Sequence, residues 1–87
     1  MRTFEFNPDK SQANLMKHGI DFAQAQQLWD DPGMIEVQAR STDEPRSIVI
    51  AKLQGKMWSA VITVRSDCIR IISVRRSRPA EVTLYES

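Results

Sequence analysis

The chain has 87 residues and carries 12 basic against 11 acidic side chains, for a formal net charge of +1. Overall charge therefore gives no sign of a strongly basic nucleic-acid-binding protein. One cysteine excludes an internal disulfide, and one cysteine with one histidine argues against a structural zinc site, so we expect no metal or cofactor. The N-terminus has no signal-peptide pattern, and no stretch approaches the roughly 20 apolar residues of a membrane span. We therefore expect one cytoplasmic domain over residues 1–87, close to the lower size limit for a self-sufficient core.

The first residues predict a short strand followed by a helix. Residues 3–6 alternate polar and apolar side chains, which is typical of a strand. Asn7 is a good N-cap, and Pro8 suits the first helical position because its missing N–H would have no partner there. The helix is expected to end at His18, because Gly19 favours the left-handed conformation that terminates helices.

A second helix is predicted immediately afterwards. Asp21 can cap it, and Gln24 stands at the spacing of a capping box. Residues 30–33, Asp-Asp-Pro-Gly, should end it, because proline disfavours helix in the residue before it. Its buried stripe is expected to contain Phe22, Ala25, Leu28 and Trp29.

The rest of the chain has the two-residue period of strands until a last helix. Strands are expected over residues 34–37, 46–53, 57–64 and 69–74, with turns at 54–56 and 65–68 and a mobile polar loop at 40–45. Residues 46–74 should form an antiparallel meander. Pro79 opens a short C-terminal helix that ends near Tyr85. The sequence thus predicts an α+β fold with two N-terminal helices packed on an antiparallel sheet of four to five strands.

Positive charge is concentrated at the end of this meander. Between residues 65 and 78 five arginines stand against one acid, a local charge of +4, whereas residues 1–64 hold seven basic and eight acidic side chains. Arginine binds phosphate well because its planar group donates two parallel hydrogen bonds and stays charged. The alternative is a set of solvated arginines that protect a sheet edge from aggregation. The arginines are Arg65, Arg70, Arg75, Arg76 and Arg78.

Few other side chains are candidates for chemistry. His18 is the default general acid or base, although a histidine at a helix end often only interacts with terminal carbonyls. Lys17 beside it could bind phosphate or be solvated. Glu81 and Tyr85 are further candidates for proton transfer, and Tyr85 is equally a packing residue. Strand alternation predicts Ser73 and Arg75 on one face of the sheet and Arg70, Val74 and Arg76 on the other.

Several segments together resemble one family. They are Phe4-Glu5-Phe6-Asn7-Pro8-Asp9-Lys10, Ala13-Asn14-Leu15, Lys17-His18-Gly19-Ile20-Asp21-Phe22, Asp31-Pro32, and Arg70-Ile71-Ile72-Ser73-Val74-Arg75-Arg76 with Glu81 and Tyr85. In these segments, which span nearly the whole chain, the sequence is similar to the BrnT family of bacterial toxins.

The resemblance implies a RelE-like fold and a ribonuclease that blocks translation. It also implies a cognate BrnA-type antitoxin with a DNA-binding domain, in a heterotetramer that contacts operator DNA only through the antitoxin. Carried over by position, it gives His18, Arg65, Arg75 and Arg76 as the active-site set. Glu81 and Tyr85 are added as further catalytic candidates, and Lys17, Arg70, Ser73 and Arg78 as RNA-binding candidates.

Two hypotheses follow from these residues. In the first, the protein cleaves RNA without metal, with arginines stabilising the developing negative charge and His18 transferring a proton. The second is a noncatalytic module that binds the antitoxin and acts as a corepressor. The first predicts that Arg75→Ala or Arg76→Ala removes toxicity without unfolding the protein.

Overall fold

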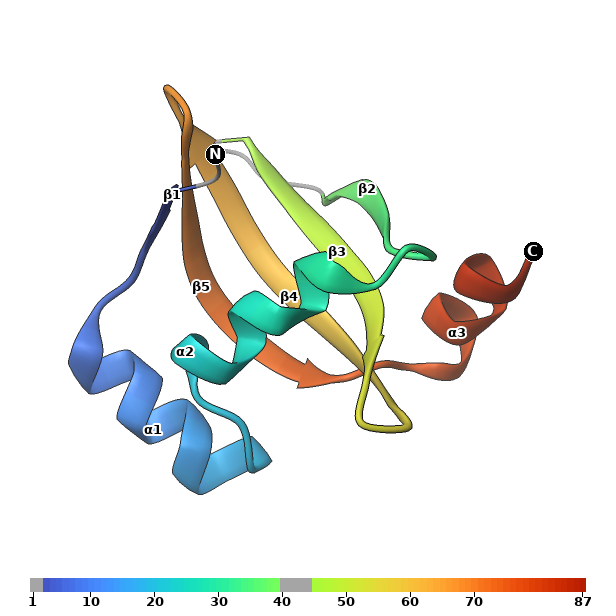
Figure 1. The fold of residues 1–87 in the computed structure, drawn as a ribbon, viewed down its shortest axis with the longest axis horizontal. Coiled ribbons are helices and arrows are strands. Elements are labelled where there is room, and N and C mark those ends of the chain that lie inside the picture. Colours follow the sequence, from blue (N-terminus) through green and yellow to red (C-terminus); the bar gives the residue numbers. More distant parts are fainter. Residues whose placement is uncertain (1–2, 40–44) are drawn as a thin grey trace.

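The computed structural model describes residues 3–39 and 45–87, so most of the polar loop expected at 40–45 lies outside the described residues. In this part of the chain α1 and α2 pack on one face of a five-stranded sheet. Helix α3 lies apart from these two helices (Figure 1). None of the described helices is both long and apolar enough to cross a membrane. The elements are β1 (Thr3–Glu5), α1 (Pro8–His18), α2 (Phe22–Ala25), the 3₁₀ helix η1 (Gln26–Asp30), β2 (Ile35–Ala39), β3 (Arg46–Leu53), β4 (Lys56–Arg65), β5 (Cys68–Arg76) and α3 (Pro79–Glu86).

The sheet has the order β1-β5-β4-β3-β2. Strands β2 to β5 pair antiparallel with their neighbours, which confirms the predicted meander. The expectation of a purely antiparallel sheet is wrong, because β1 pairs parallel to β5, with Thr3 opposite Cys68. Alternation of polar and apolar residues fixes which face a side chain takes but not the direction of its neighbour, so the sequence pattern could not reveal this pairing.

The second predicted helix is present but changes its period. It begins as α2 with the expected capping box of Asp21 and Gln24 and continues as the 3₁₀ helix η1. A 3₁₀ helix has three residues per turn, so residues three apart lie on one line. Phe22, Ala25 and Leu28 are spaced in this way, and all three are at most 1% exposed. The tighter turn therefore keeps this stripe directed at the sheet.

A bulge in β5 changes which side chains share a face. Val61 pairs with Ser73 but Ile62 pairs with Ile71, so Ile72 is an extra residue on β5. The predicted grouping of Arg70 with Arg76 is therefore wrong. Register places Arg70 on the same face as Ser73 and Arg75, and Val74 and Arg76 on the other. The core under α2 and η1 contains Val49, Ala51, Trp58, Ala60, Ile62, Ile71 and Val74.

Asn14 in α1 supplies a hydrogen-bond partner where the sheet has none. Among the described residues, β1 pairs with β5 at residues 68–70, and beyond that point β5 has no strand beside it on that side. The Asn14 side-chain oxygen accepts a hydrogen bond from the Val74 N–H at 3.1 Å, and its amide donates to the Ile20 carbonyl at 2.8 Å. One side chain thus connects the first helix to the last strand and to the loop after Gly19.

Replacing Asn14 by alanine is expected to destabilise the protein by about 2–4 kcal/mol, because a buried donor and a buried acceptor lose their partners. Urea denaturation monitored by circular dichroism measures the change. Gln12→Ala is the control, since Gln12 is exposed on the same helix. A loss below about 1 kcal/mol would show that water replaces both hydrogen bonds.

Candidate active site

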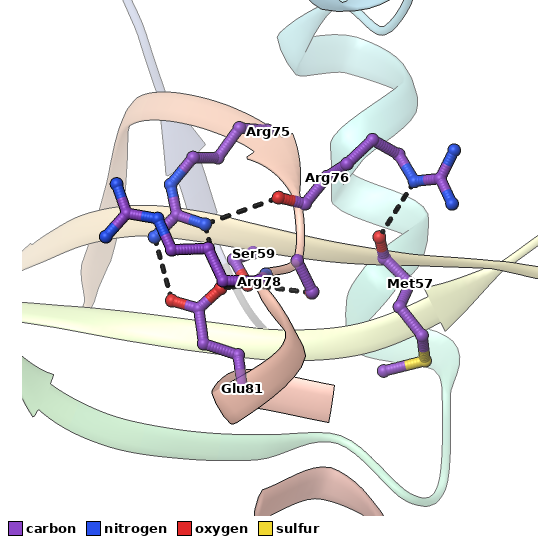
Figure 2. Close-up of polar contacts among 7 residues, drawn as sticks. Met57, Ser59, Arg75, Arg76, Arg78 and Glu81 are labelled. Carbon is purple, nitrogen blue, oxygen red and sulfur yellow. Dashed lines mark hydrogen bonds and ion pairs between the residues drawn. The ribbon is translucent and has the colours of Figure 1, made fainter. Parts of the chain in front are cut away.

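Strand β5 ends in two consecutive arginines that leave the sheet on opposite sides. Figure 2 shows Arg75 directed toward Glu81 and Arg76 directed toward the Met57 carbonyl. Neighbouring residues of a strand point to opposite faces of the sheet, so Arg75 and Arg76 cannot both contact the same group. The sequence presents Arg75 and Arg76 as a pair, but the structure gives each its own surroundings.

Arg75 holds helix α3 against the sheet. Its two terminal nitrogens donate to the two Glu81 carboxylate oxygens, each at 2.8 Å, and the two side chains are only 22% and 13% exposed. Glu81 also accepts hydrogen bonds from the Ser59 hydroxyl at 2.9 Å and from the Arg78 backbone N–H at 2.8 Å. A bidentate pair in this setting is a specific connection between two elements.

These contacts fix the charge state of Glu81. The hydrogen bond from Arg75 lowers the pKa of Glu81 to about 2, with burial opposing the shift and the Arg78 N–H and Ser59 hydroxyl assisting it. The same contact raises the pKa of Arg75. Glu81 is therefore a carboxylate at neutral pH and cannot serve as a general acid in this state, which gives it a structural role here.

Arg76 lies on the helix-covered side of the sheet. Its guanidinium carbon stands 5.5 Å from the centre of the Trp58 ring, and its Nε donates to the Met57 carbonyl at 3.3 Å. Stacking on an indole ring orients the guanidinium while leaving its terminal nitrogens available to a ligand.

Arg76, Trp58, Lys56 and His18 line one pocket of about 200 Å³. His18 enters from the last turn of α1, which Gly19 ends at φ 81° as predicted. Lys56 and Trp58 come from the start of β4. The pocket thus combines an imidazole with two cations. Its other walls are formed by Gly19, Ile20, Gln24, Gln27, Leu53 and Gln54.

Other predicted site residues lie away from this pocket. Arg65 is at the opposite end of β4, paired with Cys68, and seven residues of strand from Trp58 correspond to roughly 23 Å. A terminal guanidinium nitrogen of Arg70 lies 3.8 Å from a carboxylate oxygen of Glu5. Arg70 is on the face of the sheet that also carries Ser73 and Arg75. Lys17 and Arg78 are exposed and do not line the pocket.

Tyr85 makes a second connection between α3 and the body of the protein. Its hydroxyl donates to Asp31 at 2.7 Å, and this hydrogen bond raises the pKa of Tyr85. Asp31 also accepts from the Lys52 and Gly33 backbone N–H groups. A side chain at Gly33 would bring a Cβ within 2.9 Å of the Tyr85 hydroxyl, so the Tyr85 side chain would have to move away from its present position. Tyr85 therefore has a structural role in this arrangement.

Sequence reasoning missed Lys56, Trp58 and the glutamines of the pocket. Lys56 was expected in a turn and Trp58 in a strand, and neither position indicated a ligand site. Which β4 side chains share a face with Arg76 depends on the register of β4 and β5, and no local sequence pattern determines this register. Across residues 3–39 and 45–87, no three His, Cys, Asp or Glu side chains lie close enough to hold a metal ion.

A family model matches most of the chain. The model of the family described as ribonuclease toxin, BrnT, of type II toxin-antitoxin systems matches residues 6–81. No curated protein matches the chain. The matched segment runs from Phe6, between β1 and α1, to Glu81 in α3, and it includes every residue named above as a wall of the pocket. The chain therefore belongs to the BrnT family of ribonuclease toxins of type II toxin-antitoxin systems.

Proposed function

We propose that this toxin cleaves RNA without a metal ion and that the reaction takes place in the pocket lined by His18, Lys56 and Arg76. The observation that carries the proposal is the meeting of an imidazole and two cations in that pocket. We further propose that the fold is RelE-like, that the toxin inhibits translation and that it acts in the cytoplasm. A BrnA-type antitoxin would neutralise it in a heterotetramer that binds operator DNA through the antitoxin.

The proposed reaction uses side chains of this pocket and water. His18 accepts the proton of the RNA 2′-hydroxyl, and the 2′-oxygen attacks the adjacent phosphorus. The bond from phosphorus to the 5′-oxygen breaks, and that oxygen takes up a proton from the protonated imidazole or from water. Lys56 and Arg76 stabilise the additional negative charge on the phosphoryl oxygens in the transition state.

The products are then a 2′,3′-cyclic phosphate and a 5′-hydroxyl. This division of roles narrows the sequence-based set. His18 and Arg76 remain the catalytic candidates, while Arg75 and Glu81 hold α3 in place. Arg65, an active-site candidate from sequence, lies at the far end of β4, and Arg70 and Ser73 lie on the opposite face, so these three residues have no part in the proposed reaction.

The test incubates the purified, antitoxin-free protein with a defined RNA in EDTA, beside a folded His18→Gln variant. We expect the wild type to produce fragments ending in cyclic phosphate, and the variant to be slower by about 10²- to 10⁴-fold, the range for loss of a general acid or base. Cleavage that requires added Mg²⁺ would reject the metal-independent mechanism. Absence of cleavage, on free RNA and on translating ribosomes alike, would favour the noncatalytic corepressor.

A further inference from the structure

A second pocket adjoins the proposed active-site pocket. It has a volume of about 370 Å³, and three of its wall residues also line the first pocket, namely Gln27, Leu53 and Gln54. Its other walls come from the end of η1, the turn after it and the β3–β4 hairpin. A strand of RNA seated at Arg76 in the first pocket therefore has a neighbouring hollow for its next nucleotide.

The two pockets differ in the charge of their walls. The first has the cations Lys56 and Arg76. The second has the carboxylates of Asp30 and Asp31 and one cation, Lys52. Phosphate is therefore favoured in the first pocket and disfavoured in the second. An RNA strand with a phosphate at Arg76 is expected to place a base in the second pocket, not another phosphate.

A row of polar side chains on α2 and η1 runs past both pockets. Gln24 lines the first pocket, Gln27 lines both and Asp30 lines the second. Side chains three residues apart lie on one line in a 3₁₀ helix, so Gln27 and Asp30 of η1 stand next to each other. In the described part of the chain, neither of these two side chains forms a hydrogen bond or an ion pair. Asp31, in contrast, is already held by Tyr85 and by backbone N–H groups.

A free carboxylate beside a free amide distinguishes among the four RNA bases. The carboxylate only accepts hydrogen bonds, whereas the amide both donates and accepts. Guanine presents two adjacent donors, N1–H and the N2 amino group, beside the O6 acceptor, so it matches a carboxylate together with an amide N–H. Uracil presents one N–H between two carbonyl oxygens, which a carboxylate repels. Adenine and cytosine each present an amino group next to an acceptor nitrogen, so they satisfy one carboxylate oxygen only.

We propose that the second pocket binds a guanine base of the RNA substrate. The Asp30 carboxylate accepts hydrogen bonds from N1–H and the N2 amino group, and the Gln27 amide donates to O6. Leu53, shared by both pockets, offers apolar surface to the ring. This inference rests on the proposed function, which makes RNA the ligand of the first pocket. It predicts that the toxin cleaves beside guanosine.

The test measures binding of RNA hexamers to the full-length protein by fluorescence anisotropy. Every sugar carries fluorine in place of the 2′-hydroxyl, so the hexamers cannot be cleaved. One hexamer contains only uracil, and two others replace one central uracil by guanine or by hypoxanthine, which lacks the N2 amino group. We expect the wild type to bind the guanine hexamer about 5- to 150-fold more tightly than the uracil hexamer, the range for one bidentate base contact. The hypoxanthine hexamer should bind more weakly than the guanine hexamer.

Asp30→Asn and Gln27→Ala are the test variants, and both should fold because both positions are exposed. Removing a carboxylate normally strengthens RNA binding, since it lessens the repulsion of phosphate. Asp30→Asn should instead weaken binding of the guanine hexamer by at least about fivefold, while the uracil hexamer binds as tightly as before or more tightly. Gln27→Ala should also reduce the guanine preference. The matched control is Asp67→Asn, an exposed position in the β4–β5 turn outside both pockets, which should leave that preference within about twofold.

Cleavage of the corresponding 2′-hydroxyl hexamers in EDTA separates this inference from the proposed reaction. A guanine preference in binding that falls in Asp30→Asn supports the base pocket even if no hexamer is cleaved, a result that would count against the ribonuclease mechanism alone. Equal affinity of the wild type for the guanine and uracil hexamers overturns the base pocket, and so does an unchanged preference in a folded Asp30→Asn variant. Equal cleavage rates beside guanosine and uridine would likewise overturn it, while leaving the ribonuclease in place.

Discussion

Arg76→Ala is expected to slow RNA cleavage by about 10²- to 10³-fold, the range for loss of one preorganised group that stabilises transition-state charge. Arg76 stands over the Trp58 ring in the pocket with His18 and Lys56. Its stability contribution should be small, about 0.5–1 kcal/mol from the contact with the ring. The measurement compares single-turnover cleavage rates with unfolding free energies for the same preparations.

Two comparison variants make this result specific to the site. Lys10→Ala removes the same charge from an exposed position in the first turn of α1, outside the pocket. It should leave the cleavage rate within about twofold, because exposed charges are screened by salt. Arg76→Lys keeps the charge but loses the planar group, so it should recover only part of the rate. A folded Arg76→Ala variant with wild-type activity would remove Arg76 from the mechanism.

The second large effect concerns stability. Glu81→Gln is expected to destabilise the protein by roughly 2–3 kcal/mol, because it leaves the partly buried Arg75 guanidinium without its carboxylate. The value agrees with a fall in the pKa of Glu81 from 4.5 to about 2, which corresponds to about 3 kcal/mol as an upper limit. Urea denaturation at pH 7 gives the difference directly.

The same pair makes a pH-dependent contribution whose sign can be stated. A carboxylate with a lowered pKa stabilises the folded state above its unfolded pKa, and this stabilisation is lost as pH falls toward the folded value. For Glu81 the contribution is complete above about pH 5 and disappears toward about pH 2. The wild type should therefore lose more stability over this interval than Glu81→Gln does. Glu86→Gln, exposed on the same helix, is the control; parallel pH curves for wild type and Glu81→Gln would contradict the ion pair.

These two predictions separate residues that the sequence treated alike. From sequence, Arg75→Ala and Arg76→Ala had the same expected outcome, lost toxicity in a folded protein. The structure predicts lost stability for Arg75→Ala and lost cleavage for Arg76→Ala. Arg75 is distinguished by its contact with Glu81, six residues after it, and Arg76 by its contact with Trp58, eighteen residues before it. Neither contact joins neighbouring residues of the sequence.

Local chemistry explains which features the sequence predicted well. Asn7 accepts hydrogen bonds from the Asp9 and Lys10 N–H groups, and Gly19 takes the left-handed conformation after His18, as its type requires. Each of these features depends on residues at most a few positions apart. Helix ends, turns and the meander could therefore be inferred from neighbouring residues.

Long-range geometry explains what the sequence could not predict. The parallel pairing of β1 joins residues about 65 positions apart, and the bulge at Ile72 reverses the facing of every later residue of β5. A one-residue change in register moves Arg76 from one face to the other, so the register decides whether Arg76 lines the pocket. His18 could be proposed from its residue type, but its meeting with Lys56 and Arg76 required the tertiary structure.

The pairing of β1 with β5 also has a consequence for synthesis of this protein. Thr3 and Phe4 are synthesised well before their partners Cys68 and Ile69, so β1 cannot pair until β5 has been made. The core, which uses Ile71 and Val74, cannot close before then, and Arg76 follows only at the end of the same strand. A nascent chain interrupted before residue 68 therefore has neither a closed sheet nor a complete pocket.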